Sequence, residues 1–357
     1  MPTTIFEQTS IMSTSLQKLQ TILDKAVDNQ KIFGAAFTIR KGGEMWSIAS
    51  GNIGLHTPYF IASTTKLFVT TIILQMEEEK LLHRDDLIKK YFPESVMRGL
   101  HSLKGVDYAP QITIKHLLAH TSGIPDYFQK KADNGKSLED VIVNGNDQSW
   151  TFDECVARSK TLQPLFAPGS PSKAHYSDTN FQLLGKIIEQ VSGKKFRDIL
   201  NERIFNTLGM TDSYLYNNPT DDKPMHLYYK TKELRIPKAM TSFGPDGGVV
   251  STSQDMMTFL VAFFEGKLFS KDVLPGLYEW NRIFFPMRSG VGVHLFKLPW
   301  IFNPFGAVPA LYGHSGLSGA LAYCNPEREL FITGTVNQVA HPDLSFRMAI
   351  KLLQAVK

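Results

Sequence analysis

The chain has 357 residues, of which 43% are hydrophobic, and a formal net charge of +4. This length allows about two domains and the apolar content supplies a sizeable core, so the composition excludes a globally disordered protein. The charged residues are spread along the chain. Proteins that bind nucleic acid or anionic lipid gather basic residues into a patch, so we expect neither partner.

Two cysteines, Cys155 and Cys324, lie far apart in the sequence. They are too few for a disulfide scaffold and lack the spacing of a metal clip, so we expect free thiols and no metal. The chain has no Walker loop and no glycine-rich dinucleotide motif after a strand, so no cofactor is expected. No signal peptide and no transmembrane run of about 18 apolar residues is evident, which predicts a cytoplasmic protein.

The N-terminal part predicts a helix and a hairpin. Apolar residues at helical spacing from about residue 15 to 29 follow a capping cluster, Ser13-Thr14-Ser15. The strand-like runs 35–40 and 44–50 flank Gly42-Gly43, a pair typical of a tight turn.

The C-terminal part repeats this arrangement. Residues 320–324 and 329–336 predict two strands that are joined by a turn over 325–328. Apolar residues at helical spacing from Leu344 to Val356 predict a closing helix.

The middle of the chain is dominated by helical patterns. They cover residues 64–80, 113–119, 151–160, 179–192 and 195–205. Strands at both ends with helices between them predict an α/β (α+β) fold, in which an antiparallel sheet is flanked by helices and carries an inserted, mostly helical lobe. We place the sheet domain at residues 1–62 and 241–357, the helical domain at 63–240, and the active site in the cleft between them.

A serine and a lysine stand at the predicted start of the first central helix. If the helix begins near Ser63, the amine of Lys66 lies about one turn later, on the same face as the serine hydroxyl. A serine hydroxyl needs a positioned base to act as a nucleophile, and a lysine can be that base. Alone, this spacing is also compatible with an N-cap serine and a solvated lysine.

Two further motifs follow in the chain. Tyr176-Ser177-Asp178 comes after a Pro-Gly turn and just before a helix, which places the tyrosine on a loop where its phenol can reach a cleft. Gly313-His314-Ser315-Gly316 immediately precedes a predicted strand, and its small residues allow close approach of a ligand.

These three ordered motifs, with flanks such as LLAHTSGIPDY (117–127) and GPDGGVVSTSQDMMTF (244–259), resemble the serine β-lactamase and DD-peptidase superfamily. The similarity is greatest to the branch of class C β-lactamases, D-alanyl-D-alanine carboxypeptidases and esterases. It extends from about residue 16 to 356 and implies a β-lactamase/transpeptidase-like fold.

The resemblance also implies roles for individual residues. Ser63 would be the acylated nucleophile, Lys66 its general base, and Tyr176 the group that carries a proton to and from the leaving group. Asp178, His314, Ser315 and Gly316 would bind the substrate. The backbone N–H groups of Ser63 and Leu317 would form the oxyanion hole.

Two positions depart from the family pattern. Asp178 stands where the family usually has asparagine; an ionised carboxylate accepts hydrogen bonds only, and near Lys66 it would favour the charged ammonium and weaken the base. His314 replaces the commoner lysine. We therefore expect a hydrolase of an ester, a small amide or a peptide, acting as an esterase, D-aminopeptidase or carboxypeptidase, with a true β-lactamase or penicillin-binding DD-peptidase as the alternative.

Three other interpretations stay open at this stage. Gly313 to Leu317 nearly matches the G-x-S-x-G elbow of α/β-hydrolases, which would make Ser315 the nucleophile. His116 and His120 have the spacing of a helical zinc pair, without the glutamate of that motif. The protein is alternatively a non-catalytic binding protein that retains the fold.

Aromatic segments are candidates for the walls of the cleft. They are Tyr127-Phe128, Tyr214 to Tyr216, and a stretch that we take as a connecting region with Trp280, Phe284, Phe285, Phe296, Trp300, Phe302 and Phe305. Any of the last group that are exposed would form an acyl-binding pocket or contact a lipid or partner.

Overall fold

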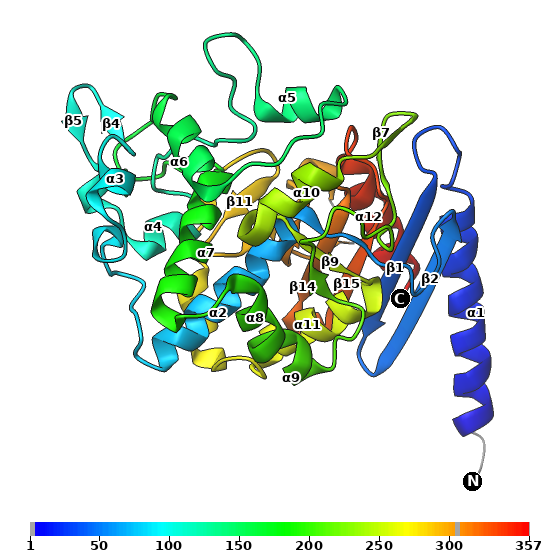
Figure 1. Ribbon diagram of the computed structural model, residues 1–357. Coiled ribbons are helices and arrows are strands. Elements are labelled where there is room, and N and C mark those ends of the chain that lie inside the picture. The colour runs from blue at the N-terminus through cyan, green and yellow to red at the C-terminus, as the bar shows by residue number, and fades with distance from the viewer. Residues whose placement is uncertain (1–3, 304–307, 357) are drawn as a thin grey trace.

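The structure is a computed structural model that describes residues 4–303 and 308–356; of residues 4–13 and 302 it describes the backbone alone. Its centre is an eight-stranded antiparallel sheet in the order β10-β11-β12-β13-β14-β15-β1-β2 (Figure 1). The strands are β1 (Gly34–Lys41), β2 (Glu44–Gly51), β10 (Asn281–Arg282), β11 (Met287–Ser289), β12 (His294–Phe296), β13 (Leu311–Ser315), β14 (Ala320–Asn325) and β15 (Leu330–Thr335).

The two ends of the chain meet in this sheet. β1 pairs with β15, with Ala36 opposite Thr335 and Lys41 opposite Leu330. Both predicted hairpins are present, β1 with β2 and β14 with β15. The predicted pairing of N-terminal and C-terminal strands in one antiparallel sheet is therefore confirmed.

Helices cover both faces of the sheet because side chains alternate along each strand. Phe37 and Ile39 of β1 point to the face covered by α1 (Thr4–Asp24) and α12 (Asp343–Ala355). Between them, Thr38 points to the other face and bonds Ser253 of α11 (Ser253–Glu265) at 2.9 Å. Figure 1 shows α1 alongside β2 at the outer part of the sheet.

The helical part lies between β3 (Tyr59–Phe60) and β9 (Val249–Ser251), which form a small sheet with β6 (Tyr214–Leu215). Its helices are η1 (Ala62–Thr65), α2 (Lys66–Glu78), α3 (Glu94–Met97), α4 (Ile114–Leu118), α5 (Leu138–Val143), α6 (Phe152–Lys160), α7 (Asp178–Ser192), α8 (Phe196–Leu200), α9 (Asn206–Leu208) and α10 (Pro237–Phe243). Two small hairpins, β4 (Ser102–Leu103) with β5 (Val106–Asp107) and β7 (Leu227–Tyr229) with β8 (Lys232–Leu234), complete it.

Each of the predicted central helices has a counterpart here, in α2, α4, α6, α7 and α8; the last continues as a π-helical turn, η4 (Asn201–Phe205). Helix α2 is buried on almost every side, from Lys66 to Leu74. Its apolar residues belong to one core that also includes residues of α4, α7, α11 and β14. This packing fixes the first turn of α2, and hence the serine before it, relative to the sheet. Within the described ranges, no helix is long and apolar enough to cross a membrane.

The first helix differs from its prediction. It begins at Thr4, so the Ser13 to Ser15 cluster lies inside it instead of capping it. It ends at Asp24, not near 29, because Asp28 Oδ1 accepts the backbone N–H groups of the next residues, 30–32, and closes a turn.

The stretch from Trp280 is wrongly predicted as a connecting region. It contributes β10, β11 and β12 to the central sheet. These strands have only two or three residues each, too few to show the alternation that identifies a strand. Phe305 lies outside the described residues. Of the rest, Phe296 is buried, whereas Phe284, Phe285 and Trp300 are exposed.

Candidate active site

Ser63 and Lys66 meet as their spacing predicts. Ser63 lies in η1, directly after β3, and Lys66 is the first residue of α2. Lys66 Nζ donates to Ser63 Oγ at 3.2 Å. Ala62, just before the serine, has a left-handed backbone with φ of 45°. A non-glycine residue in this conformation is strained, and such strain often occurs at functional sites.

The amine of Lys66 is fully buried and makes two further contacts. It lies 2.6 Å from Asp178 Oδ1, and it donates to the backbone carbonyl of Asp246 at 2.5 Å. Asp178 begins α7, so the ion pair joins the first turns of two helices. The serine oxygen, the Asp178 carboxylate and the Asp246 carbonyl together fix the position of the Lys66 nitrogen.

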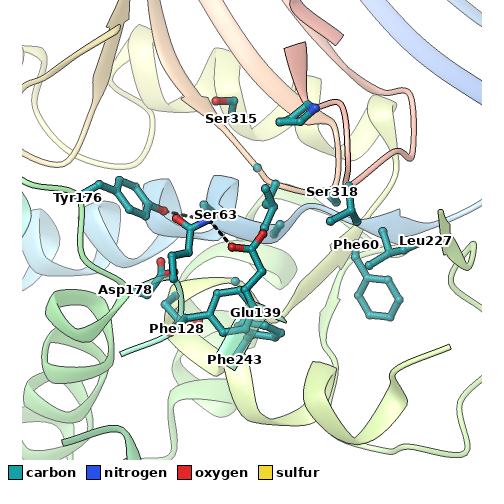
Figure 2. Close-up of a pocket in the computed structure, with 18 of the residues that line it drawn as sticks. Phe60, Ser63, Phe128, Glu139, Tyr176, Asp178, Leu227, Phe243, Ser315 and Ser318 are labelled. Carbon is teal, nitrogen blue, oxygen red and sulfur yellow. Dashed lines mark hydrogen bonds between the residues drawn. The ribbon is translucent and has the colours of Figure 1, made fainter. Parts of the chain in front are cut away.

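Tyr176 approaches Ser63 from the other side. Its hydroxyl donates to Ser63 Oγ at 2.7 Å (Figure 2). Burial first, and then the charge of Asp178, raise the pKa of the Tyr176 phenol well above its ordinary value. The phenol therefore carries its proton and is suited to give it to a leaving group.

His120 holds the loop that carries Tyr176. Its carbonyl accepts the N–H of His175, and its Nδ1 accepts the N–H of Ser177 at 3.1 Å. Its ring stacks on the Tyr176 ring with centroids 4.6 Å apart. Burial lowers the pKa of His120 well below its usual range, so the ring is neutral. His120 therefore holds Tyr176 by three contacts. It accepts the backbone N–H groups of the residues before and after the tyrosine, and its ring stacks on the tyrosine ring.

His294 and His314 form a stacked pair beside Tyr176, with centroids 3.9 Å apart. Burial lowers the pKa of His294 to about 3 and that of His314 well below its usual range. His314 Nδ1 donates to the carbonyl of Ser315 at 2.8 Å. Neither ring nitrogen of His294 has a hydrogen-bond partner among the described residues. The pair thus presents neutral rings, and no cation, to the site.

Asp246 and Asp126 are two further buried carboxyls near Lys66. Asp246 Oδ2 accepts from the Tyr127 hydroxyl and from Gln182 Nε2, each at 2.9 Å. Burial and the charge of Asp178 raise the pKa of Asp246 well above its usual range and that of Asp126 to about 8. Among the described residues, Asp178 is the carboxylate that forms an ion pair with Lys66.

The end of β13 comes very close to the serine. A Cβ on Gly316 would lie 2.4 Å from the Ile61 carbonyl oxygen and 2.8 Å from Ala62 Cβ, so only glycine fits there. Leu317, the next residue, lines the same pocket as Ser63.

A cavity of about 480 Å³ opens at Ser63. Tyr176, Asp178, Ser315, Gly316 and Leu317 contribute to its lining, while His314 lies behind it, under His294. Its other walls are mostly apolar and come from the helical part and from the β11 and β12 region: Phe60, Phe128, Ile142, Val143, Leu227, Leu234, Ile236, Met240, Phe243, Phe284, Phe285, Met287 and Phe296. Most of the sequence-predicted site residues therefore line one pocket, and Lys66 and His314 are buried beside it.

The nucleophile-elbow and zinc-pair interpretations of the motifs do not fit the structure around them. Ser315 ends strand β13 and is followed by strand β14, whereas a nucleophile elbow needs a helix there. His116 Nδ1 accepts the N–H of Thr113 in a capping box, and His120 has left α4 and faces Tyr176. The two histidines therefore have separate structural roles.

Sequence reasoning missed the part that His120, Asp246 and His294 play beside Ser63 and Tyr176, and it missed Gln129 and Glu139, which also line the pocket. They come from separate segments that only the fold brings together. Asp246 had the best available signal, because the Gly-Pro-Asp-Gly-Gly run around it indicates an unusual backbone.

Comparisons with known proteins agree with this architecture. A family model described as Beta-lactamase matches residues 19–357. A putative penicillin-binding protein PbpX of Bacillus subtilis (strain 168) is 26% identical over 261 residues, which cover 71% of this chain and 57% of that protein. The chain thus spans less than two thirds of the length of this relative.

Two further matches cover more of both chains. A putative D-alanyl-D-alanine carboxypeptidase of Escherichia coli (strain K12) is 26% identical over 358 residues, 90% of this chain and 78% of that protein. The solved structure of a D-stereospecific amidohydrolase from Streptomyces sp. superposes with a TM-score of 0.75 at 26% identity, covering 91% of this chain and 95% of that one.

Proposed function

The chain belongs to the beta-lactamase family, and we propose that it is a serine hydrolase that cleaves an ester or a small amide or peptide through an acyl-enzyme. The observation that carries the proposal is the pair of hydrogen bonds on Ser63 Oγ, from Lys66 at 3.2 Å and from Tyr176 at 2.7 Å. A nucleophile with a base and an acid within hydrogen-bond reach is what acyl transfer needs. The Streptomyces relative is by its name an amidohydrolase, which supports an amide or ester substrate.

In the proposed acylation, Lys66 acts in its amine form. It takes the proton of Ser63 while Oγ bonds to the substrate carbonyl carbon, and the carbonyl electrons move to its oxygen. The backbone N–H groups of Ser63 and Leu317 hold this oxyanion. Tyr176 gives its proton to the leaving nitrogen or oxygen and regains one from the Lys66 ammonium.

Deacylation reverses these proton transfers. Tyr176 passes its proton to the Lys66 amine and takes one from the water molecule, whose oxygen bonds to the acyl carbon while the carbonyl electrons move to the oxygen. When the carbonyl re-forms, the bond from the acyl carbon to Ser63 Oγ breaks and the serine oxygen takes the proton of the Lys66 ammonium. In this proposal Asp178 and Ser315 bind the substrate from either side of Ser63. Gly316 allows the end of β13 to come close to Ser63, and His314 holds Ser315 by a hydrogen bond to the Ser315 carbonyl. The sheet part (1–62 and 241–357) and the helical part (63–240) would form the two walls of the cleft.

The pocket charges favour this function over a β-lactamase or a penicillin-binding DD-peptidase. The substrates of those enzymes carry a carboxylate. No lysine or arginine is among the described residues that line the pocket, and His314 is neutral. A non-catalytic role is disfavoured because Ser63, Lys66 and Tyr176 are all present and in contact.

The test is intact-protein mass spectrometry after incubation with a fluorophosphonate, a penicillin and p-nitrophenyl butyrate. We expect the fluorophosphonate to label the wild type and Ser315→Ala, but not Ser63→Ala. Ester turnover should be lost in Ser63→Ala and only reduced in Ser315→Ala, because Ser315 would bind the substrate without being acylated. A lasting penicillin adduct without ester turnover would favour the penicillin-binding alternative. A wild type that takes no label and hydrolyses no ester would overturn the catalytic proposal, and labelling lost only in Ser315→Ala would overturn the choice of nucleophile.

A further inference from the structure

Glu139 is a charged group in an otherwise apolar part of the pocket. It lies at the start of α5 and contributes to the pocket lining with Phe128, Ile142 and Phe243. Figure 2 shows its side chain extending into the pocket on the side of Ser63, above Phe128 and Phe243. It does not belong to the Lys66 and Tyr176 group, and the proposed reaction makes no use of it.

The other acidic residues of the pocket lining have partners. Asp178 pairs with Lys66, and Asp246 is held by Tyr127 and Gln182. Asp343 pairs with Arg347 at 2.9 Å. Glu139 accepts a hydrogen bond from Gln129 Nε2 at 3.1 Å, and in the part of the chain that the structure describes it has no cationic partner.

The position of Glu139 is fixed by the backbone. Its N–H donates to the Phe128 carbonyl at 3.1 Å, which ties the start of α5 to the loop that carries Gln129. Asp126 Oδ1 in turn accepts the N–H groups of Phe128 and Gln129. The carboxylate and the carboxamide therefore form a preorganised pair, so they require little rearrangement to bind a ligand.

A half-buried carboxylate without a counter-charge is costly, and a cationic ligand group relieves that cost. Burial raises the pKa of Glu139, as expected for such a carboxylate. The same pocket has no lysine or arginine in its described lining, so it offers nothing to an anionic substrate. The charge pattern selects for a positive group next to an apolar one.

We propose that Glu139 and Gln129 form an ammonium-binding subsite, and that the preferred substrates are esters or amides whose acyl part carries a free amine and an apolar side chain. This inference rests on the proposed function of Ser63. The ammonium would donate to the Glu139 carboxylate, while the side chain packs against the aromatic residues of the pocket.

The test compares two esters with the same leaving group. They are phenylalanine methyl ester, assayed as each enantiomer, and methyl 3-phenylpropanoate, which lacks only the amine. We expect the wild type to prefer the amino ester. Because it removes the charge with which the ammonium would pair, Glu139→Gln should lower kcat/KM for the amino ester about tenfold or more. The same variant should keep kcat/KM for methyl 3-phenylpropanoate within about twofold of the wild-type value.

Two further variants sharpen the result. Glu94→Gln removes an equal charge from an exposed ion pair with Arg98 and should change kcat/KM for neither ester. Glu139→Lys should lower the rate with the amino ester and raise it with monomethyl succinate, whose acyl part carries a carboxylate. Hydrolysis of methyl 3-phenylpropanoate by each variant shows that the variant is folded and still forms the acyl-enzyme.

The outcomes separate the two proposals. If the wild type hydrolyses methyl 3-phenylpropanoate but does not prefer either amino ester, the subsite is refuted and the hydrolase stands. The subsite is also refuted if Glu139→Gln changes kcat/KM for the amino ester and for methyl 3-phenylpropanoate by the same factor. If the wild type hydrolyses none of these esters and takes no fluorophosphonate label, the proposed function fails, and the subsite with it.

Discussion

The Lys66 amine nitrogen lies 2.6 Å from a carboxylate oxygen of Asp178, and both residues are buried. The same nitrogen lies 3.2 Å from Ser63 Oγ. The identity of residue 178 therefore affects how firmly the amine is held beside the serine.

Asp178→Ala should lower kcat/KM by releasing the Lys66 amine from its place beside Ser63. The carboxylate lies 2.6 Å from Nζ, and loss of a buried partner loosens the geometry on which the chemical step depends, so we expect kcat/KM for p-nitrophenyl butyrate to fall about tenfold or more. Asp178→Asn, which keeps an oxygen that can accept from Nζ, should retain more activity. Equal losses in the two variants would contradict the role assigned to the ion pair.

His120→Ala should slow the reaction by loosening Tyr176. The change removes the acceptor for the Ser177 N–H and the ring that stacks on Tyr176. We expect kcat to fall about tenfold or more with KM nearly unchanged, because positioning acts on the chemical step. His120→Asn, which tolerates the positive φ of 58° and keeps an oxygen acceptor, should retain more activity. Equal losses in both variants, or a change confined to KM, would argue against a positioning role.

His294 should make the protein less stable as the pH falls from about 6.5 toward 3. Its pKa in the folded state is about 3, below the ordinary value of 6.5, so over this range the unfolded chain binds the proton and the folded chain does not. The unfolded state then binds more protons, and the free energy of unfolding decreases as the pH falls.

The raised pKa values of Asp126 and Asp246 act in the opposite direction over part of this range, so the informative quantity is a difference. Between pH 7 and 4, the urea midpoint of His294→Leu should fall less, or rise more, than that of the wild type. Parallel curves for the two proteins would mean that His294 titrates normally in the folded state.

Phe284→Ala should reduce the preference for long acyl chains. Phe284 is 51% exposed and contributes to the pocket lining, so its loss removes apolar contact with a long chain but not with an acetyl group. We expect kcat/KM for p-nitrophenyl octanoate, relative to the acetate, to fall about fivefold or more, since a partly lost aromatic contact costs about 1–2 kcal/mol. Trp300→Ala is the control, because Trp300 is 77% exposed and is not among the described lining residues. An unchanged chain-length profile in Phe284→Ala would exclude this pocket as the acyl site.

Local spacing in the sequence determined the first half of the candidate site. Ser63 and Lys66 are separated by about one helical turn, so their contact follows from helix geometry as soon as a helix begins there. The two terminal hairpins were also predictable, because each consists of two strand-like runs around a short turn. The position of Tyr176 near Ser63 came from the order of the motifs and the family resemblance, not from spacing.

Tertiary structure alone decided what surrounds these groups. His120, Asp246 and His294 lie on separate segments: a loop, a three-residue 3-10 helix and a short strand, none of which leaves a periodic pattern. Glu139 looks in the sequence like an ordinary exposed residue of a short helix, and only packing of that helix against the Gln129 loop turns it into the pocket. Charge balance, ring stacking and burial depend on distances between segments far apart in the chain, and a single sequence carries no record of those distances.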